Sequence, residues 1–339
     1  MTRVAIIPTL TDGKAGLWST ARSEGRIPLN WGALLGANGY DVTVISQGGD
    51  FDGCKIPGVK FAGPDEAPEV DLVLFGSTSR ASSNWFGRST LRAKGAVRLQ
   101  WPTGGSIDHS GDVVAVASAH LADQVATECG VAREQIHALP SPVLPLAWWD
   151  AACGRTTAPM PERKLILWGA RDAFAGSAQP AGEACLSALE QSHLLRLSLL
   201  LLSTEQYAPH LIDRFKALGG TCFTSGLHLG KVLLMMRLSV LCVTGPAFMG
   251  PTLTEAIFED CAPLVWAAYR PLFPKLCEAA SKHGVLVEHD GQVRAIMERI
   301  VVDWKMRAEY VDSCKFAFAD HSPAKCLEAW RAMEARCGL

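Results

Sequence analysis

The segment VLCVTGPAFMGPTLTEAIFEDCAPLVW, residues 240–266, contains one complete unit of the predicted fold. It opens with the apolar run Val240–Val243, passes through a loop rich in glycine and proline, and continues as the helical pattern Leu253–Phe258. A second apolar run, Pro263–Trp266, follows. Two neighbouring strands joined by a helix run parallel, because a parallel pair needs a crossover connection. This stretch therefore predicts an α/β fold.

The same order of strand, loop and helix recurs on both sides of this segment. The N-terminal half begins with a strand at Val4–Ile7, a glycine-containing loop at Thr11–Gly16, a helix at Pro28–Gly39 and a strand at Asp41–Ser46. Further elements are expected at Leu72–Phe75, Ala96–Gln100, Val113–Ala117, Ala119–Cys129, Leu165–Trp168, Gly182–Glu190, Leu197–Leu202, Pro209–Leu218, Thr221–Phe223, His228–Met236 and Val285–Val287. After Gly291 only helices are expected, the last over Pro323–Arg336. Strands that alternate with helices predict parallel sheets covered on both faces.

The pattern breaks once, between Leu139 and Lys164. Five prolines surround Trp148-Trp149 there without a sustained period, which is typical of an interdomain linker. The 339 residues also exceed the ~250 to 300 at which single cores stop growing. We therefore expect a Rossmann-like domain over residues 1–145, a linker over 146–163, a second Rossmann-like domain over 164–322 and a C-terminal helix over 323–339.

Composition excludes several classes of protein. Hydrophobic residues make up 48% and charged residues 19%, a globular balance. The 32 lysines and arginines against 34 acidic residues give a formal charge of −2, so the overall field does not attract nucleic acid or anionic lipid. Eleven cysteines are scattered without a CxxC pair, which suits reduced thiols in a core.

The chain also lacks targeting and membrane-spanning patterns. Its first residues are too short an apolar run for a signal peptide. The most apolar segment, Leu194–Leu202, is interrupted by Arg196 and falls short of the ~20 residues that span a bilayer. We expect a cytoplasmic protein without a transmembrane segment.

Three segments together resemble one family of enzymes. They are RIPLNWGALLGANGYDVTVIS (26–46), the run Val113–Leu144 that ends in IHALPSPVL, and TGPAFMGPTLTEAIFEDCAPLVW (244–266). Their order is similar to that of the retaining GT-B glycosyltransferases of family four, and the third segment resembles the part that carries the paired glutamates of that family. The resemblance implies two Rossmann-like domains that face a central cleft, with the C-terminal helix packed back on the first domain.

The resemblance also implies an activity, transfer of a hexose from a nucleoside-diphosphate sugar to a hydroxyl acceptor with retention, with UDP-sugar favoured over GDP-sugar and no further cofactor. Glu255 falls on the glutamate that contacts the donor ribose, and a carboxylate is a good acceptor for vicinal hydroxyls. It is alternatively an ordinary first-turn glutamate stabilised by the helix dipole. The other glutamate of the pair is replaced by Ala247, which removes a group that contacts the transferred sugar.

The remaining donor-side residues belong to loops before helices. Gly250 matches the family glycine that lets amides approach the pyrophosphate, although Pro251 removes one amide. Arg171 resembles the arginine that neutralises the donor phosphates, and the family lysine that follows it is absent. Lys14 is a candidate replacement for that cation, and Arg171 is alternatively a solvated loop residue. The full donor-binding set is Gly13, Lys14, Gly16, Arg171, Gly226, Gly250, Thr252, Leu253 and Glu255.

Asp108 and His109 are the candidate catalytic residues. They end the glycine-rich run TGGSIDH, residues 103–109, at the place where the family has a polar group near the transferred sugar. In an inverting enzyme one of them would deprotonate the acceptor, and in a retaining enzyme it would bind the sugar. Alternatively, both are turn-forming surface residues.

Residues 72–107 hold five basic side chains, no acidic ones, and interleaved aromatics. Such a set suits an anionic acceptor, a phosphorylated glycan, an anionic lipid or DNA with a hydroxylated base, because phosphates need neutralising and bases or sugars need stacking surfaces. The alternative is a basic face paired with carboxylates elsewhere. The acceptor-binding candidates are Arg80, Trp85, Arg88 and Arg92.

Asp50-Phe51-Asp52 has the spacing with which another class of glycosyltransferase binds a divalent metal, but it lies among glycines and is typical of a turn. We expect no required metal. Two alternatives to glycosyl transfer stay open: a nucleotide-sugar epimerase of the same architecture, and an inactive nucleotide-sugar-binding scaffold that lost the first glutamate.

Overall fold

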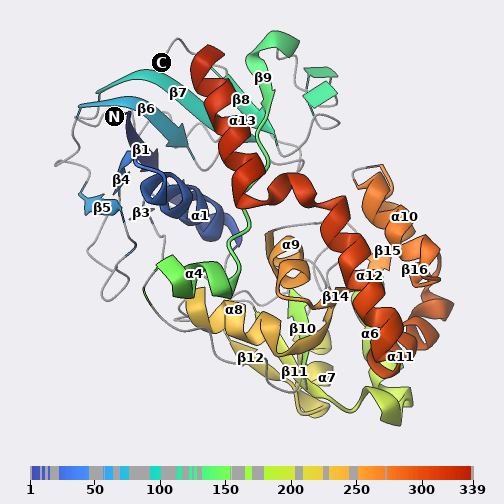
Figure 1. The fold of residues 1–339 in the computed structure, drawn as a ribbon. Coiled ribbons are helices and arrows are strands. Elements are labelled where there is room, and N and C mark those ends of the chain that lie inside the picture. The colour runs from blue at the N-terminus through green and yellow to red at the C-terminus, as the bar shows by residue number, and fades with distance from the viewer. Residues whose placement is uncertain are drawn as a thin grey trace. The chain divides into compact units, whose positions relative to one another are not determined.

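A computed structural model gives the structure of the chain, and its elements are shown in Figure 1. The structure describes residues 2–7, 10–11, 14–15, 23–45, 56, 58–63, 69–75, 92–100, 113–116, 122–123, 126–127, 132–152, 154, 165–169, 179–202, 209–223, 229–243, 251–271 and 273–336. The chain divides into two compact units. Unit 1 comprises Met1–Leu144, Trp148–Thr156 and Asp320–Leu339, and unit 2 comprises Pro145–Ala147 and Thr157–Ala319.

Unit 1 is built on a seven-stranded sheet with the order β5-β4-β1-β6-β7-β8-β9. All of its neighbouring strands pair in parallel. The chain order reverses beside β1, whose residues Val4 to Ile7 are at most 1% exposed. This is the doubly wound arrangement predicted from the alternation of strands and helices. The strands are β1 Arg3–Ile7, β4 Asp41–Ile45, β5 Val59–Ala62, β6 Glu69–Phe75, β7 Arg92–Gln100, β8 Val113–Val116 and β9 Ile136–Ala138.

Helix α1 (Ser23–Ala37) packs on β1 and β4. At Gly32 the packing is close, because an added Cβ would lie 3.2 Å from the Cδ1 atom of Ile6. The helix begins five residues before Pro28, where the sequence pattern placed its start because proline favours the first helical position. Gly39, with φ of +85°, reverses the chain after the helix and leads it into β4.

The C-terminal helix α13 (Pro323–Arg336) packs on α1, as expected (Figure 1). The ring centroids of Trp31 and Trp330 lie 5.2 Å apart, and both side chains are fully buried. At the edge of this pair, the hydroxyl of Tyr40 donates a 2.6 Å hydrogen bond to Oε2 of Glu334. Burial and this bond raise the pKa of Tyr40 to about 12, so the phenol stays protonated.

Two segments of unit 1 far apart in sequence are hydrogen-bonded side by side. The amide of Val143 donates to the carbonyl of His321 over 3.0 Å, and Nδ1 of His321 lies 2.9 Å from the carbonyl oxygen of Ser141. Since a carbonyl only accepts, the Nδ1 atom carries the proton. The side chain of Asn30 donates to the carbonyl of Pro142 over 3.1 Å and ties the same segment to α1.

Unit 2 has a five-stranded parallel sheet with the order β12-β11-β10-β13-β14, and a separate parallel pair β15-β16. Its strands are β10 Leu165–Gly169, β11 Ser198–Leu202, β12 Thr221–Phe223, β13 Ser239–Val243, β14 Ala262–Pro263, β15 Val265–Trp266 and β16 Leu286–Val287. Its α-helices are α6 Gln179–Gln191, α7 Pro209–Ala217, α8 Leu229–Arg237, α9 Pro251–Phe258, α10 Pro274–Lys282, α11 Val293–Val302 and α12 Trp304–Ala317. The order reverses between β10 and β13, so this sheet is also doubly wound.

Several elements differ from the sequence-based expectation. The expected loop Thr11–Gly16 contains a short antiparallel hairpin, β2 (Leu10–Thr11) with β3 (Lys14–Ala15). The expected strand Pro263–Trp266 is divided between β14 and β15. Within residues 146–163, predicted as an irregular linker, the structure has helix α4 (Leu146–Ala152). The helix has seven residues and prolines around it, so its sequence shows no recognisable helical period.

None of the seven cysteines in the described ranges forms a disulfide, and six of them are buried, in keeping with core cysteines. None of the helices in those ranges is long and apolar enough to cross a membrane.

Replacement of Trp330 with alanine will test the packing of α13. Deleting a fully buried indole removes apolar contacts and leaves a cavity, so the free energy of unfolding should fall by about 3–5 kcal/mol. Urea denaturation of the wild-type and variant proteins measures the change. Trp304→Ala is the matched control, because Trp304 is 70% exposed and its loss should change the stability by less than about 0.5 kcal/mol. Equal effects of the two replacements would contradict the packing.

Candidate functional site

Helix α9 is the element that positions the predicted donor site in unit 2. It starts at Pro251, at the first helical position, where a missing amide is tolerated. It follows β13, and ligands of doubly wound sheets bind at the carboxyl ends of the strands, next to the N-termini of the following helices. Thr252 and Leu253 lie in its first turn and are 7% and 0% exposed.

Glu255 lies in the second turn of α9, whereas the sequence pattern had placed it in the first turn. The helix begins two residues before the expected Leu253, so Glu255 is its fifth residue. Its side chain is 1% exposed. Burying an ionised carboxylate this completely costs free energy, so the side chain needs polar or charged surroundings.

A second buried carboxylate, Glu259, lies one helical turn further along. It directly follows α9, is 4% exposed, and its amide still bonds the carbonyl of Glu255. Residues four apart share one face of a helix, so both carboxylates lie on the same side of α9. Oε1 of Glu259 accepts a hydrogen bond from the backbone amide of Leu146, the first residue of α4. Sequence reasoning missed this residue, although an acid on a largely apolar helix was a signal.

The surroundings of Glu259 favour its neutral form. Burial raises the pKa of this carboxyl to about 7, and the nearby charges of Asp260 and Glu255 act in the same direction. The hydrogen bond from Leu146 and the positive charge of Arg237 oppose the rise. Glu259 therefore changes its charge near neutral pH, where an exposed glutamate is fully ionised.

The other end of α9 closes with Asp260 in a left-handed conformation. Its φ is +62°, a region that residues other than glycine rarely adopt. The carboxylate forms an ion pair with Lys315 of α12. A cavity of ≈ 300 Å³ lies beside this pair, at the C-terminal end of α9 and so away from the predicted donor edge, and is lined by Asp260, Trp304, Arg307, Ala308, Val311 and Asp312.

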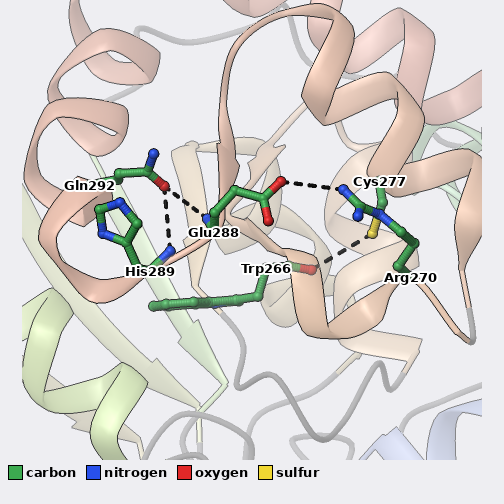
Figure 2. A network of polar contacts seen from close by, with 6 residues as sticks. All are labelled: Trp266, Arg270, Cys277, Glu288, His289 and Gln292. Carbon is green, nitrogen blue, oxygen red and sulfur yellow. Dashed lines mark hydrogen bonds and ion pairs between the residues drawn. The ribbon is translucent and has the colours of Figure 1, made fainter.

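A further polar network fixes the loops after β15 and β16 (Figure 2). The amide of Glu288 donates to Oε1 of Gln292 over 2.9 Å, and its carboxylate pairs with Arg270 at 3.3 Å. The thiol of Cys277 donates to the carbonyl of Trp266, which ends β15. Burial raises the pKa of Cys277 to about 11, so the thiol keeps the proton it donates. These contacts hold together the loops that follow the carboxyl ends of β15 and β16, and they supply no reactive group.

Of the predicted site residues, the structure brings together Thr252, Leu253 and Glu255 on α9. Lys14 and Arg92 lie in strands β3 and β7, and their side chains are outside the described part. The remaining candidates lie outside the described residues altogether; they are Gly13, Gly16, Arg80, Trp85, Arg88, Asp108, His109, Arg171, Gly226 and Gly250, together with Ala247 and the Asp50–Asp52 pair. Across the ranges that are described, no three side chains of His, Cys, Asp or Glu form a metal-binding group.

No protein-family model matches the sequence, and no curated protein matches it. Solved structures match the fold over nearly the whole chain. A glycosyltransferase from Rickettsia africae ESF-5 has a TM-score of 0.64 at 11% identity and covers 99% of this chain and 98% of its own. Sucrose-phosphate synthase from Thermosynechococcus elongatus has a TM-score of 0.63 at 13% identity, with 99% of both chains covered. Anabaena Alr3699/HepE, in complex with UDP and glucose, has a TM-score of 0.60 at 12% identity and full coverage of both.

These likenesses establish the class of fold. The chain has the GT-B architecture of two Rossmann-like domains, as the resemblance of its sequence to family four implied. Because the identities are between 11% and 13%, these likenesses show the architecture of the chain alone.

Replacement of Glu259 with glutamine will test the raised pKa. In the unfolded chain this carboxyl titrates near 4.5, and in the fold near 7, so the wild-type protein is most stable below the unfolded pKa and loses stability as the pH rises to about 7. The shift corresponds to roughly 3 kcal/mol. Glutamine stays neutral at every pH. The difference in unfolding free energy, Glu259→Gln minus wild type, should therefore increase from pH 4.5 to pH 7 and be constant above pH 7. Urea denaturation at several pH values measures this difference. A difference that is independent of pH would contradict the assignment.

Proposed function

We propose that the protein is a glycosyltransferase that moves a sugar from a nucleoside-diphosphate sugar, UDP-sugar in preference to GDP-sugar, to a hydroxyl group of an acceptor. The observation that carries the proposal is the match of the complete GT-B architecture to glycosyltransferases over at least 98% of both chains. The preference for UDP is supported by the Anabaena protein, whose structure holds UDP and glucose.

Helix α9 is the proposed cradle of the donor. Its first-turn amides point away from the helix along its axis, and a helix N-terminus favours the negative charge of a diphosphate. Pro251 contributes no amide, so Thr252 and Leu253 carry that interaction. Glu255 is the proposed acceptor of the ribose hydroxyl hydrogen bonds.

The chemistry of transfer is charge stabilisation of the departing diphosphate. In our proposal the guanidinium of Arg171 and the ammonium of Lys14 supply the positive charge, so that no divalent metal is required. Asp108 and His109 are proposed to contact the transferred sugar, with retention at its anomeric carbon. The basic and aromatic residues Arg80, Trp85, Arg88 and Arg92 are proposed to receive an anionic acceptor, which includes glycan, lipid and modified DNA.

One observation favours a second function, a binding scaffold without turnover. Ala247 occupies the position of the family glutamate that contacts the transferred sugar. A protein that kept Glu255 and lost that group would bind the donor and not cleave it. An epimerase of the same architecture would invert one carbon of the sugar and release it still bonded to the nucleoside diphosphate.

Incubation with a panel of UDP- and GDP-sugars, with and without EDTA, separates these functions. We expect slow release of UDP from at least one UDP-sugar, unaffected by EDTA, because water replaces the absent acceptor. A thermal shift with donor but no hydrolysis would favour the scaffold, and a changed sugar configuration would favour the epimerase. Neither a shift nor hydrolysis with any donor would contradict every version of the proposal.

Glu255→Ala should raise the dissociation constant of the donor more than tenfold, about 1.4 kcal/mol, because the ribose loses its acceptor. Isothermal titration with UDP measures the constant. Glu190→Ala is the matched control, since Glu190 is an exposed carboxylate of unit 2 paired with Arg214. Because Glu255 is buried, Glu255→Gln is included as a variant of equal size, and its melting temperature shows whether the fold survives. Unchanged affinity in both variants would reject the ribose role.

A further inference from the structure

Helix α4 belongs to both units of the chain. Leu146 and Ala147, its first two residues, are part of unit 2, whereas its remainder from Trp148 is part of unit 1. We call α4 the connector helix. The end of the connector helix that begins at Leu146 is therefore part of unit 2.

The attachment is made by the carboxylate of Glu259. The first amides of a helix have no partner within the helix, and the residue before Leu146 is a proline without an amide. Oε1 of Glu259, 113 residues further along the chain, accepts the hydrogen bond of the Leu146 amide. Negative charge is also favoured at a helix N-terminus, so the ionised carboxylate is the better partner.

The same short helix α9 carries Glu255, one turn before Glu259, and both side chains are buried in unit 2. A helix of two turns transmits a displacement from one end to the other as a rigid element. We propose that Glu259 is a positioning residue that ties the start of the connector helix to the donor helix α9, and that gain or loss of its proton sets how firmly the connector is held. The effect on the donor site rests on the proposed function, whereas the hydrogen bond of Glu259 to the Leu146 amide does not.

Burial of Glu259, together with the charges around it, places this control near neutral pH. Arg237 of α8 attracts the carboxylate, whereas Glu255 and Asp260 of the α9 segment repel it. From α12, Lys315 pairs with Asp260 and so offsets part of that repulsion. Burial is the largest cause of the raised pKa, and the value of about 7 means that a modest change in pH changes the charge. Above this pH the charged carboxylate accepts the stronger hydrogen bond, and the connector helix is held more firmly.

Amide hydrogen exchange at Leu146 in the full chain tests the proposal directly. After correction for the intrinsic exchange rate, protection in the wild type should be about tenfold greater at pH 8 than at pH 6. Glu259→Gln keeps an acceptor oxygen and has no charge, so its protection should be independent of pH. Glu259→Ala should lose protection at both pH values. Glu190→Gln, which neutralises an exposed carboxylate of the same unit, should follow the wild type.

The proposal is wrong if Glu259→Gln shows the same rise with pH as the wild type, or if Glu259→Ala keeps the wild-type protection. Because the alanine variant leaves the partly buried amide of Leu146 without its acceptor and can misfold, the glutamine variant of equal size decides the matter alone.

Donor hydrolysis tests the link to the donor site. The wild-type kcat should show an inflection near pH 7 that is absent from Glu259→Gln, with KM for the donor unchanged. If the Leu146 amide shows the expected pH-dependent protection but the protein hydrolyses no donor, the attachment is upheld and the proposed function is refuted. Hydrolysis with the same pH profile in both proteins would refute the link while the proposed function stands.

Discussion

The hydrogen bonds between His321 and the segment 141–143 are the constraint on which unit 1 depends. His321 and Ser141 are 180 residues apart in sequence, and both segments of unit 2 lie between them. Two bonds in opposite directions, one through the backbone carbonyl of His321 and one through its ring, fix the segment that leaves unit 1 against the segment that returns. Burial lowers the pKa of His321, so the ring stays neutral and keeps the donor role at physiological pH.

The return of the chain also explains why α13 is part of unit 1. Once the backbone is fixed at His321, the helix that follows is directed onto α1, where Trp330 buries its ring against Trp31. The indole pair contributes apolar burial, and at the edge of the contact the hydroxyl of Tyr40 donates a hydrogen bond to one carboxylate oxygen of Glu334. Unit 1 is thus assembled from three separate pieces of the sequence.

Most of the sheet was predictable from the sequence because strands buried on both faces leave apolar runs. The elements that were missed lack this signal. Strand β5 is partly exposed and carries Lys60, β9 has three residues, and α4 is a short helix among prolines. That Glu255 lies on a helix after an apolar strand was predictable from the pattern around it, although helix α9 begins two residues earlier than expected. The role of Glu259 was not, because its partner is a backbone amide 113 residues away, and an amide has no sequence signature.

The membership of α13 in unit 1 determines the order in which the chain becomes complete during synthesis. Domains generally fold as units, with the N-terminal one first as it leaves the ribosome. Here residues 157–319 of unit 2 are contiguous and available before Trp330 has been made. Unit 1, although it begins first, finishes last, and the surface of α1 around Trp31 stays open to solvent until the final helix arrives. During that interval the nascent chain exposes the indole of Trp31, which α13 buries only when Trp330 has been made.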